Sequence, residues 1–216
     1  CTSPYTCLAA IADGMVYIAE QTSHANARDA STGSGVRSSD TSNSKAISYG
    51  IEKLKWTISR VFIVFNTSGI STTVTDANLY IRGLTNNSGD IIAVKSTWDG
   101  KTTLATSHYN DLDFSTPYSS EVSTWLTSTS QNEIALNAQA KADMQNNDFI
   151  SFALINHTYD YSDTSSINTE TNGMYFTEQS GTGSDPKLGY TLAAATTPIT
   201  LSAGTITVKS GLITIT

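Results

Sequence analysis

Charged side chains are scarce in this 216-residue chain, and the positive ones are the scarcer. Lys and Arg number 12 against 19 Asp and Glu, which gives a formal net charge of −7. A surface that binds nucleic acid or an anionic membrane needs clustered Lys and Arg, so we expect neither partner. No apolar run approaches the roughly 20 residues that cross a bilayer, so no membrane span is predicted.

Sequence motifs of catalysis are also missing. The chain has no H-E-x-x-H, no G-x-S-x-G, no phosphate-binding loop and no C-x-x-C. Its histidines lie far apart in predicted loops, where a lone His is usually solvated: His24, His108 and His157. Carboxylates do occur in pairs that a glycosidase could use, but such pairs are common in acidic loops: Asp111 with Asp113, and Asp160 with Asp163. We therefore expect no enzymatic activity.

Cysteine is limited to Cys1 and Cys7. A disulfide between them would close only the N-terminal tip and could not support a core, and two free thiols are the alternative. The chain begins with Cys rather than Met, which is typical of a processed or incompletely recorded protein.

Hydroxyl side chains dominate what is present, because Ser and Thr make up 62 of the 216 residues. Branched Thr suits exposed strand faces and Ser suits turns, so this composition predicts an all-β protein. The clearest strand pair is 58–65 with 74–81. Every position of 61–65 is apolar, which predicts a strand covered on both faces. The second run has one break in its alternation, which a β-bulge would restore; its core candidates are Val74, Ala77, Leu79 and Ile81.

About nine strands and up to two short helices are predicted in all. The other strands are expected at 15–19, 46–51, 91–95, 133–136, 149–156, 174–177 and 188–192, with 54–58 leading directly into 58–65, and the helices at 119–126 and 138–145. Long polar segments, 22–45, 97–117 and 157–172, separate them. Because long connections favour crossings between sheets, we predict an antiparallel jelly-roll β-sandwich over 15–192, preceded by an N-terminal arm at 1–14 that could form a helical turn.

Residues 193–216 are predicted to be a linker and an assembly tail. Three units with a seven-residue period begin at 198, 205 and 212, and the first two end in Gly. Each unit is too small to bury much surface alone, so we expect these short strands to add to a sheet edge of this chain or of a neighbour. The apolar positions of the tail are Ile199, Leu201, Ile206, Val208, Ile213 and Ile215.

Several of these predicted strands resemble sequence motifs of a known family. MVYIA, SRVFIVFNTSGI and TDANLYIRG, followed by FISFALIN and MYFTEQSGTGSDPKLGYTL, resemble the signature of DNRLRE-type domains over roughly 15–192. The family often has Asp after its Phe-x-Phe run, where this chain has Asn66. The resemblance implies a jelly roll similar to carbohydrate-binding modules, of the kind found in secreted, surface and viral proteins. LDFSTPYSSEVSTW also resembles segments of bacteriophage structural proteins.

Two kinds of binding site follow as expectations. Jelly-roll carbohydrate modules often hold a structural calcium, and five loop carboxylates could supply oxygen ligands: Asp13, Asp76, Asp148, Asp160 and Asp163. No other cofactor is expected. Sugar binding usually needs an exposed aromatic platform beside polar groups, or these rings could instead fold over the core edge; the candidates are Tyr159, Tyr161, Trp98 and Tyr109.

These observations lead to a non-enzymatic structural protein of a virion, either a capsid decoration or a fibre or appendage component. Its expected partners are other copies of itself or other structural subunits, and its expected place is the virion surface. The alternatives are a carbohydrate-binding or adhesion domain of a secreted or cell-surface bacterial protein that binds surface glycans, and a subunit of an extracellular filament.

Overall fold

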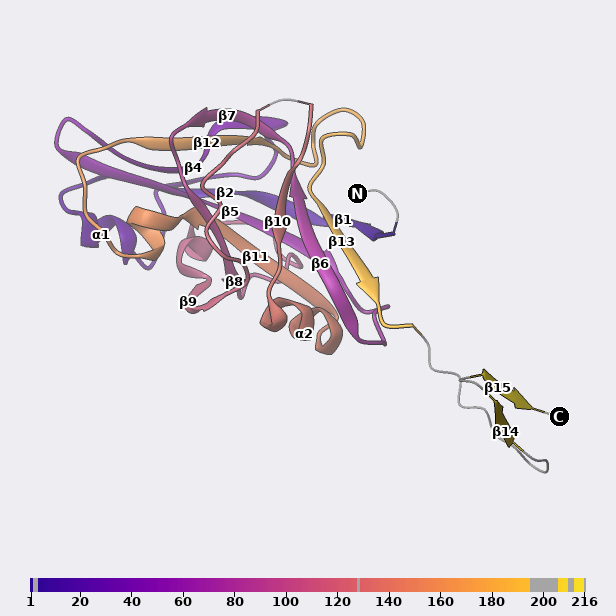
Figure 1. Cartoon of the computed structure of the whole chain (residues 1–216). Coiled ribbons are helices and arrows are strands. Elements are labelled where there is room, and N and C mark those ends of the chain that lie inside the picture. The colour runs from indigo at the N-terminus through magenta and orange to yellow at the C-terminus, as the bar shows by residue number, and fades with distance from the viewer. Residues whose placement is uncertain (2–3, 128, 195–205, 210–211, 216) are drawn as a thin grey trace.

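The computed structural model describes residues 1, 4–127, 129–194, 206–209 and 212–215, which are mostly strands in antiparallel sheets (Figure 1). A four-stranded sheet has the order β1 (Thr6–Ala9), β13 (Lys187–Leu192), β6 (Val74–Ile81) and β10 (Asn132–Ala135). A nine-stranded sheet runs β7 (Gly83–Asn87), β12 (Glu170–Tyr175), β4 (Ser42–Glu52), β5 (Lys55–Asn66), β11 (Phe149–Asn156), β8 (Ile91–Ser96) and β9 (Leu112–Pro117), with β2 (Ala12–Gln21) on β5 and β3 (Gly35–Arg37) on β2. The predicted β-rich class is confirmed.

Strand β5 is the centre of the larger sheet. Along one edge it pairs with β2, and along the other it pairs first with β4 and then with β11. Its alternate side chains enter two different cores. Val61, Ile63 and Phe65 lie in the core that the two sheets share, and Phe62 and Val64 lie in a second core on the opposite face. The prediction that 61–65 is covered on both faces is confirmed.

The second core is covered by three short helical segments: α1 (His24–Arg28), η1 (Thr106–Asn110) and η2 (His157–Tyr161). The expectation that 22–45 and 157–172 are polar surface loops throughout is therefore corrected. A buried cation ties these segments down. The guanidinium of Arg60 donates to both carboxylate oxygens of Asp160, at 2.8 and 2.7 Å, and to the carbonyl oxygens of Arg28 and Tyr109. These hydrogen bonds join α1, η1 and η2 to β5, and no local sequence signal predicts them.

The helix predicted at 119–126 does not form. Ile91 and Val122 exchange two backbone hydrogen bonds, and Ser119 bridges Leu136, so this segment lies extended between β8 and β10. The indole Nε1 of Trp125 donates to the Gly173 carbonyl oxygen, which fixes the end of the segment. Its backbone is thus satisfied by neighbouring strands rather than by its own turns.

The predicted helix at 138–145 is confirmed as α2 (Ala138–Asn146). Asn137 caps it, because its side-chain oxygen accepts from the Ala140 backbone N–H at 3.0 Å.

The bulge predicted in β6 is also confirmed. The register between β6 and β13 shifts between Thr191 and Leu192, which stand opposite Asp76 and Val74. Thr75 is the extra residue that restores the alternation.

The N-terminal arm is a strand rather than a helical turn. Thr6–Ala9 forms β1, which pairs with β13, so the 1–14 arm contributes to the four-stranded sheet instead of forming a helical turn. A disulfide joins Cys1 and Cys7. At the other end β14 (Ile206–Lys209) and β15 (Leu212–Ile215) form their own two-stranded sheet, with Ile206 opposite Ile215 and Val208 opposite Ile213. Ile199 and Leu201 lie outside the described residues. Among the described residues, no helix has the length and apolar character needed to cross a membrane.

Candidate functional site

Beyond the four-stranded sheet, the inner face of the larger sheet continues as an open polar surface. In β5, Val61 lies in the shared core, and Ser59 is the next residue on the same face. In β2 the same step leads from Met15 to Tyr17. Figure 1 shows β4, β5 and β12 running on past β6 and β10. The uncovered part of this face is the surface that can meet a ligand.

Hydroxyl groups line up in register across this surface. Thr171 of β12 pairs with Ser48 of β4, Ser48 with Ser59 of β5, and Ser59 with Tyr17 of β2. Neighbouring strands lie about 4.8 Å apart, so the row places a hydroxyl at each strand across the sheet. Each hydroxyl donates one hydrogen bond and accepts others. Ser48 and Ser59 are only 6 and 4% exposed and Thr171 and Tyr17 are half-buried, so the row forms the floor of this face, with regularly spaced donors and acceptors along it.

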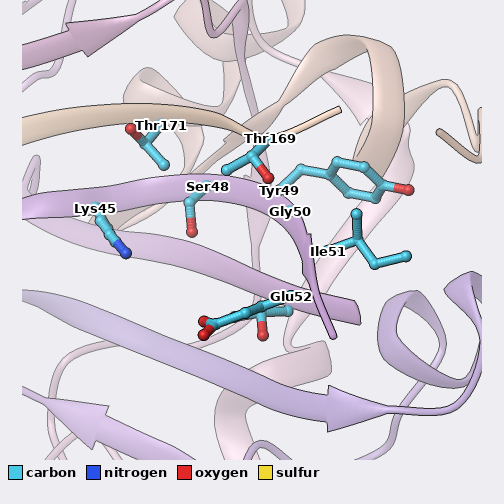
Figure 2. Close-up of a pocket in the computed structure, with 9 residues that line it drawn as sticks. Lys45, Ser48, Tyr49, Gly50, Ile51, Glu52, Thr169 and Thr171 are labelled. Atoms are coloured by element: carbon cyan, nitrogen blue, oxygen red, sulfur yellow. The ribbon is translucent and has the colours of Figure 1, made fainter. Parts of the chain in front are cut away.

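Two adjoining hollows make this surface concave, and together we call them the polar groove. One, of about 290 Å³, is lined by Lys45, Ser48, Tyr49, Gly50, Ile51, Glu52, Thr57, Thr169 and Thr171. The other, of about 470 Å³, shares Lys45, Ser48 and Thr57 with the first and adds Met15, Tyr17, Arg37, Asp40, Ser42, Asn43, Ser44 and Ser59. In Figure 2 the side chains of Lys45, Ser48 and Glu52 extend from one side of β4, and the ring of Tyr49 points away from them.

Charges of both signs border the polar groove. Arg37 and Asp40 form an ion pair at 3.2 Å with both side chains partly exposed. Lys45 and Glu52 are exposed, and no hydrogen bond or ion pair among the described residues uses the Lys45 ammonium or the Glu52 carboxylate. Both groups are thus available to a ligand, and the groove has no strong preference for one sign of charge.

Tyr17 is the aromatic residue that lines the second hollow, whereas the ring of Tyr49, which borders the first, points away from the neighbouring groove side chains (Figure 2). Tyr17 pairs with Gly35 of β3, and a Cβ atom added to Gly35 would lie 2.4 Å from the Tyr17 Oη and 2.5 Å from its Cζ. The ring therefore occupies the space above Gly35, which only glycine leaves open. An aromatic ring held against a sheet in this way presents a rigid apolar surface beside polar neighbours.

Three of the four rings predicted for an exposed aromatic platform are buried. Trp98 and Tyr159 are 3 and 7% exposed, and Tyr109 is fully buried. Tyr159 packs on Tyr49, and Trp98 packs on Phe62. Tyr161 is half-buried and stacks on His157. Of these four rings, Tyr161 is the most exposed, so it is the one left for the predicted platform.

The five carboxylates expected to bind calcium have different surroundings. Asp160 is paired with Arg60, Asp76 accepts from the Tyr5 hydroxyl at 2.5 Å, and Asp13 accepts from the backbone N–H and hydroxyl of Thr177. Burial, together with the charge of Glu178, raises the pKa of Asp13 to about 7. Asp148 is exposed, and Asp163 lies 3.6 Å from His24.

The sequence predicts solvated histidines, and this prediction is wrong for His24. His24 is 7% exposed, and its Nε2 lies 2.9 Å from the Tyr159 carbonyl oxygen. His108 accepts from the Ala105 backbone N–H through Nδ1. Within the part of the chain that the structure describes, the group of His and carboxylate side chains that surrounds one point is Asp90, Glu121 and His157.

Comparison with protein-family models finds no match, and comparison with curated proteins finds none. The resemblance to DNRLRE-type domains therefore stays a prediction. The polar groove was missed by sequence reasoning, although a signal was present. Ser48, Gly50 and Glu52 alternate with the apolar Tyr49 and Ile51, which is typical of one open strand face.

Proposed function

We propose that the chain is a non-enzymatic module that binds glycans in the polar groove. The observation that carries this proposal is the registered row of hydroxyls from Thr171 to Tyr17, which ends on an aromatic ring. A sugar presents a dense set of hydroxyls on its rim and an apolar C–H surface on its ring face. The row supplies partners for the first, and Tyr17 supplies a stacking surface for the second.

The charges support a glycan over an ionic ligand. Lys45 and Glu52 place one free cation and one free anion at the same hollow, so a ligand of high charge would be repelled by one of them. Neutral or amino-substituted sugars bring no such conflict. The groove is open and shallow, which suits an extended oligosaccharide more than a small enclosed substrate.

The proposed setting follows the sequence. We keep the jelly-roll arrangement and the extracellular or surface location as parts of the proposal, because the hydroxyl-rich, weakly charged composition and the resemblance to DNRLRE-type domains both favour them. Glycan-binding sandwiches act by attachment, and the groove alone would suffice for that role.

Binding to a glycan array, followed by calorimetry with the best oligosaccharide, tests this function. Tyr17→Ala and Lys45→Ala are expected to weaken binding at least tenfold. Tyr161→Ala is the matched comparison, because it removes the half-buried ring left for the predicted platform, which lies on the opposite face of the larger sheet. A blank array, or weaker binding in Tyr161→Ala with unchanged binding in Tyr17→Ala, would remove the groove as a glycan site.

A second candidate function rests on the C-terminal repeat. Among the described residues β14 and β15 pair with each other and with no strand of the two larger sheets. We propose that this hairpin is an assembly element of a virion decoration or appendage protein, or of an extracellular filament. Light scattering of the full chain and of residues 1–194 tests this role: the full chain should self-associate and the truncated chain should not. Two monomeric proteins would contradict it, and electron microscopy of the native source would separate shell from filament.

A further inference from the structure

A separate cluster of three potential metal ligands lies away from the polar groove. It consists of Asp90, Glu121 and His157, each of which offers an atom within 4.8 Å of the other two. None of the three lines the groove. The cluster sits where β8 begins, where β11 passes into η2, and beside the extended segment that contains Val122.

The distances in this cluster fit an ion better than they fit direct contacts. The Nδ1 atom of His157 lies 3.6 Å from the Asp90 Oδ2 and 3.6 Å from the Glu121 Oε2. A separation of 3.6 Å is too long for a hydrogen bond. A tetrahedral ion with bonds of about 2.0–2.1 Å holds its ligand atoms about 3.3–3.4 Å apart. The two His157 distances are close to this value, and the two carboxylates, which lie within 4.8 Å of each other, would have to move toward the ion.

The atom of His157 that faces the two carboxylates is Nδ1. Nδ1 of His157 is shielded from solvent and has no hydrogen-bond partner among the described residues. A buried polar atom without a partner is costly and needs an explanation. The stacked ring of Tyr161, at 5.7 Å between centroids, holds the imidazole in this orientation. The unpartnered Nδ1 is the second observation, beside the cluster itself, that points to a ligand.

The backbone holds the three side chains in place. Ile91 pairs with Val122 on one side and with Asn156 on the other, and each ligand is the immediate chain neighbour of one of these residues. Asp90 is further oriented by Thr158, whose backbone N–H donates to Oδ1 at 3.2 Å and whose hydroxyl donates to Oδ2. Such outer contacts are what keep a ligating carboxylate aligned.

We propose that Asp90, Glu121 and His157 bind a divalent transition-metal ion of the zinc type, with a fourth position open to solvent. One imidazole with two carboxylates suits zinc and its neighbours, whereas calcium and magnesium prefer oxygen alone. The Glu121 side chain is 44% exposed, so the open position faces solvent on its side. The ion would join β8, the start of η2 and the 119–126 segment, which lacks helical bonds of its own.

Metal titration of the full chain tests this site. Isothermal calorimetry with ZnCl₂ should show one site of micromolar or tighter affinity, and CaCl₂ and MgCl₂ should bind at least 100-fold more weakly. His157→Ala and Glu121→Gln should each weaken zinc binding at least tenfold. Asp148→Asn, which changes an exposed carboxylate elsewhere, should leave it unchanged.

A direct readout separates ligation from a general effect on folding. On zinc addition the ¹⁵N resonance of the His157 Nδ1 should shift strongly, while the resonances of His24 and His108 should not. Thermal denaturation should show zinc raising the melting temperature of the native chain and not that of Glu121→Gln, a variant that keeps the size of the side chain. No zinc binding, tighter binding of calcium, or equal affinity in His157→Ala would overturn the proposal.

Discussion

Arg60 and Asp160 form a two-pronged ion pair in which both side chains are fully buried. Burial works against the charge of Arg60, but the Asp160 carboxylate outweighs it, so the pKa of Arg60 is raised. The guanidinium also lies 4.1 Å from the centre of the Tyr109 ring. This pair fastens η2 to β5 and therefore holds the cover of the second core in place.

Loss of one partner of this pair should be severe. Asp160→Asn leaves a buried cation without its counter-charge, so we expect a loss of about 3–5 kcal/mol in the free energy of unfolding. Joint replacement, Arg60→Met with Asp160→Leu, should recover much of that loss. Asp40→Asn breaks the exposed pair with Arg37 and should cost less than about 1 kcal/mol. Urea denaturation measures all three, and a small effect of Asp160→Asn would contradict this account.

The buried carboxyl of Asp13 should make stability depend on pH. Its folded pKa of about 7 lies above the ordinary value of 3.8, so the folded chain holds the proton more tightly than the unfolded chain. The contribution is complete below about pH 4 and is lost as the pH rises through 7, by at most about 4 kcal/mol. Asp13→Asn stays neutral, so its melting temperature should fall less than that of the native chain between pH 5 and 8. Asp148→Asn serves as the exposed control, and parallel pH profiles would contradict the prediction.

The pair Tyr118 and Asp143 should show the opposite pH behaviour. Burial raises the pKa of Asp143, but hydrogen bonds from Tyr118, at 2.5 Å, and from Lys95, at 2.9 Å, outweigh it and lower the pKa. The resulting stability is present above the unfolded pKa and is lost as the pH falls through the folded one. Tyr118→Phe should therefore cost about 1–3 kcal/mol at pH 7 and less at pH 3, as measured by denaturation at both values. A cost that does not change with pH would exclude the hydrogen bond as its source.

Two glycines provide a matched test of packing. A Cβ added to Gly83 would lie 2.1 Å from the Leu126 carbonyl oxygen and 2.7 Å from the Trp125 Nε1, whereas one added to Gly69 would meet nothing within 4 Å. Gly83→Ala should destabilise the fold by about 1–3 kcal/mol, because backbone must move. Gly69→Ala should be neutral or stabilising by up to about 1 kcal/mol. Similar melting temperatures for the two variants would contradict the packing at Gly83.

Much of the strand pattern could be predicted because apolar alternation reports burial directly. The two-faced run at 61–65, the bulge near Thr75 and the helix after Asn137 all have local signals. The segment with Trp125 was predicted as a helix because its apolar spacing fits one. Its backbone partners, Ile91 and Leu136, are distant in sequence, so no local pattern could show that they would override this preference.

The candidate sites depended even more on distant pairings. Tyr17, Ser59 and Thr171 become neighbours only once β2, β5, β4 and β12 are in register. Asp90, Glu121 and His157 are separated by 31 and 36 positions, and no spacing rule joins them. The polar surroundings of Tyr159 and Trp98 in the sequence predict exposed rings, but both rings belong to a second core on the outer face of the larger sheet, which a two-sheet sandwich does not predict.

The two-faced burial of β5 also has a consequence for how the molecule unfolds. Val61 and Phe62 are adjacent residues that belong to different cores. Opening either core pulls on the same strand and exposes part of the other, so the two cores cannot melt as independent units. The domain should unfold in one cooperative transition, and the β5 amides should be among the slowest to exchange with deuterium.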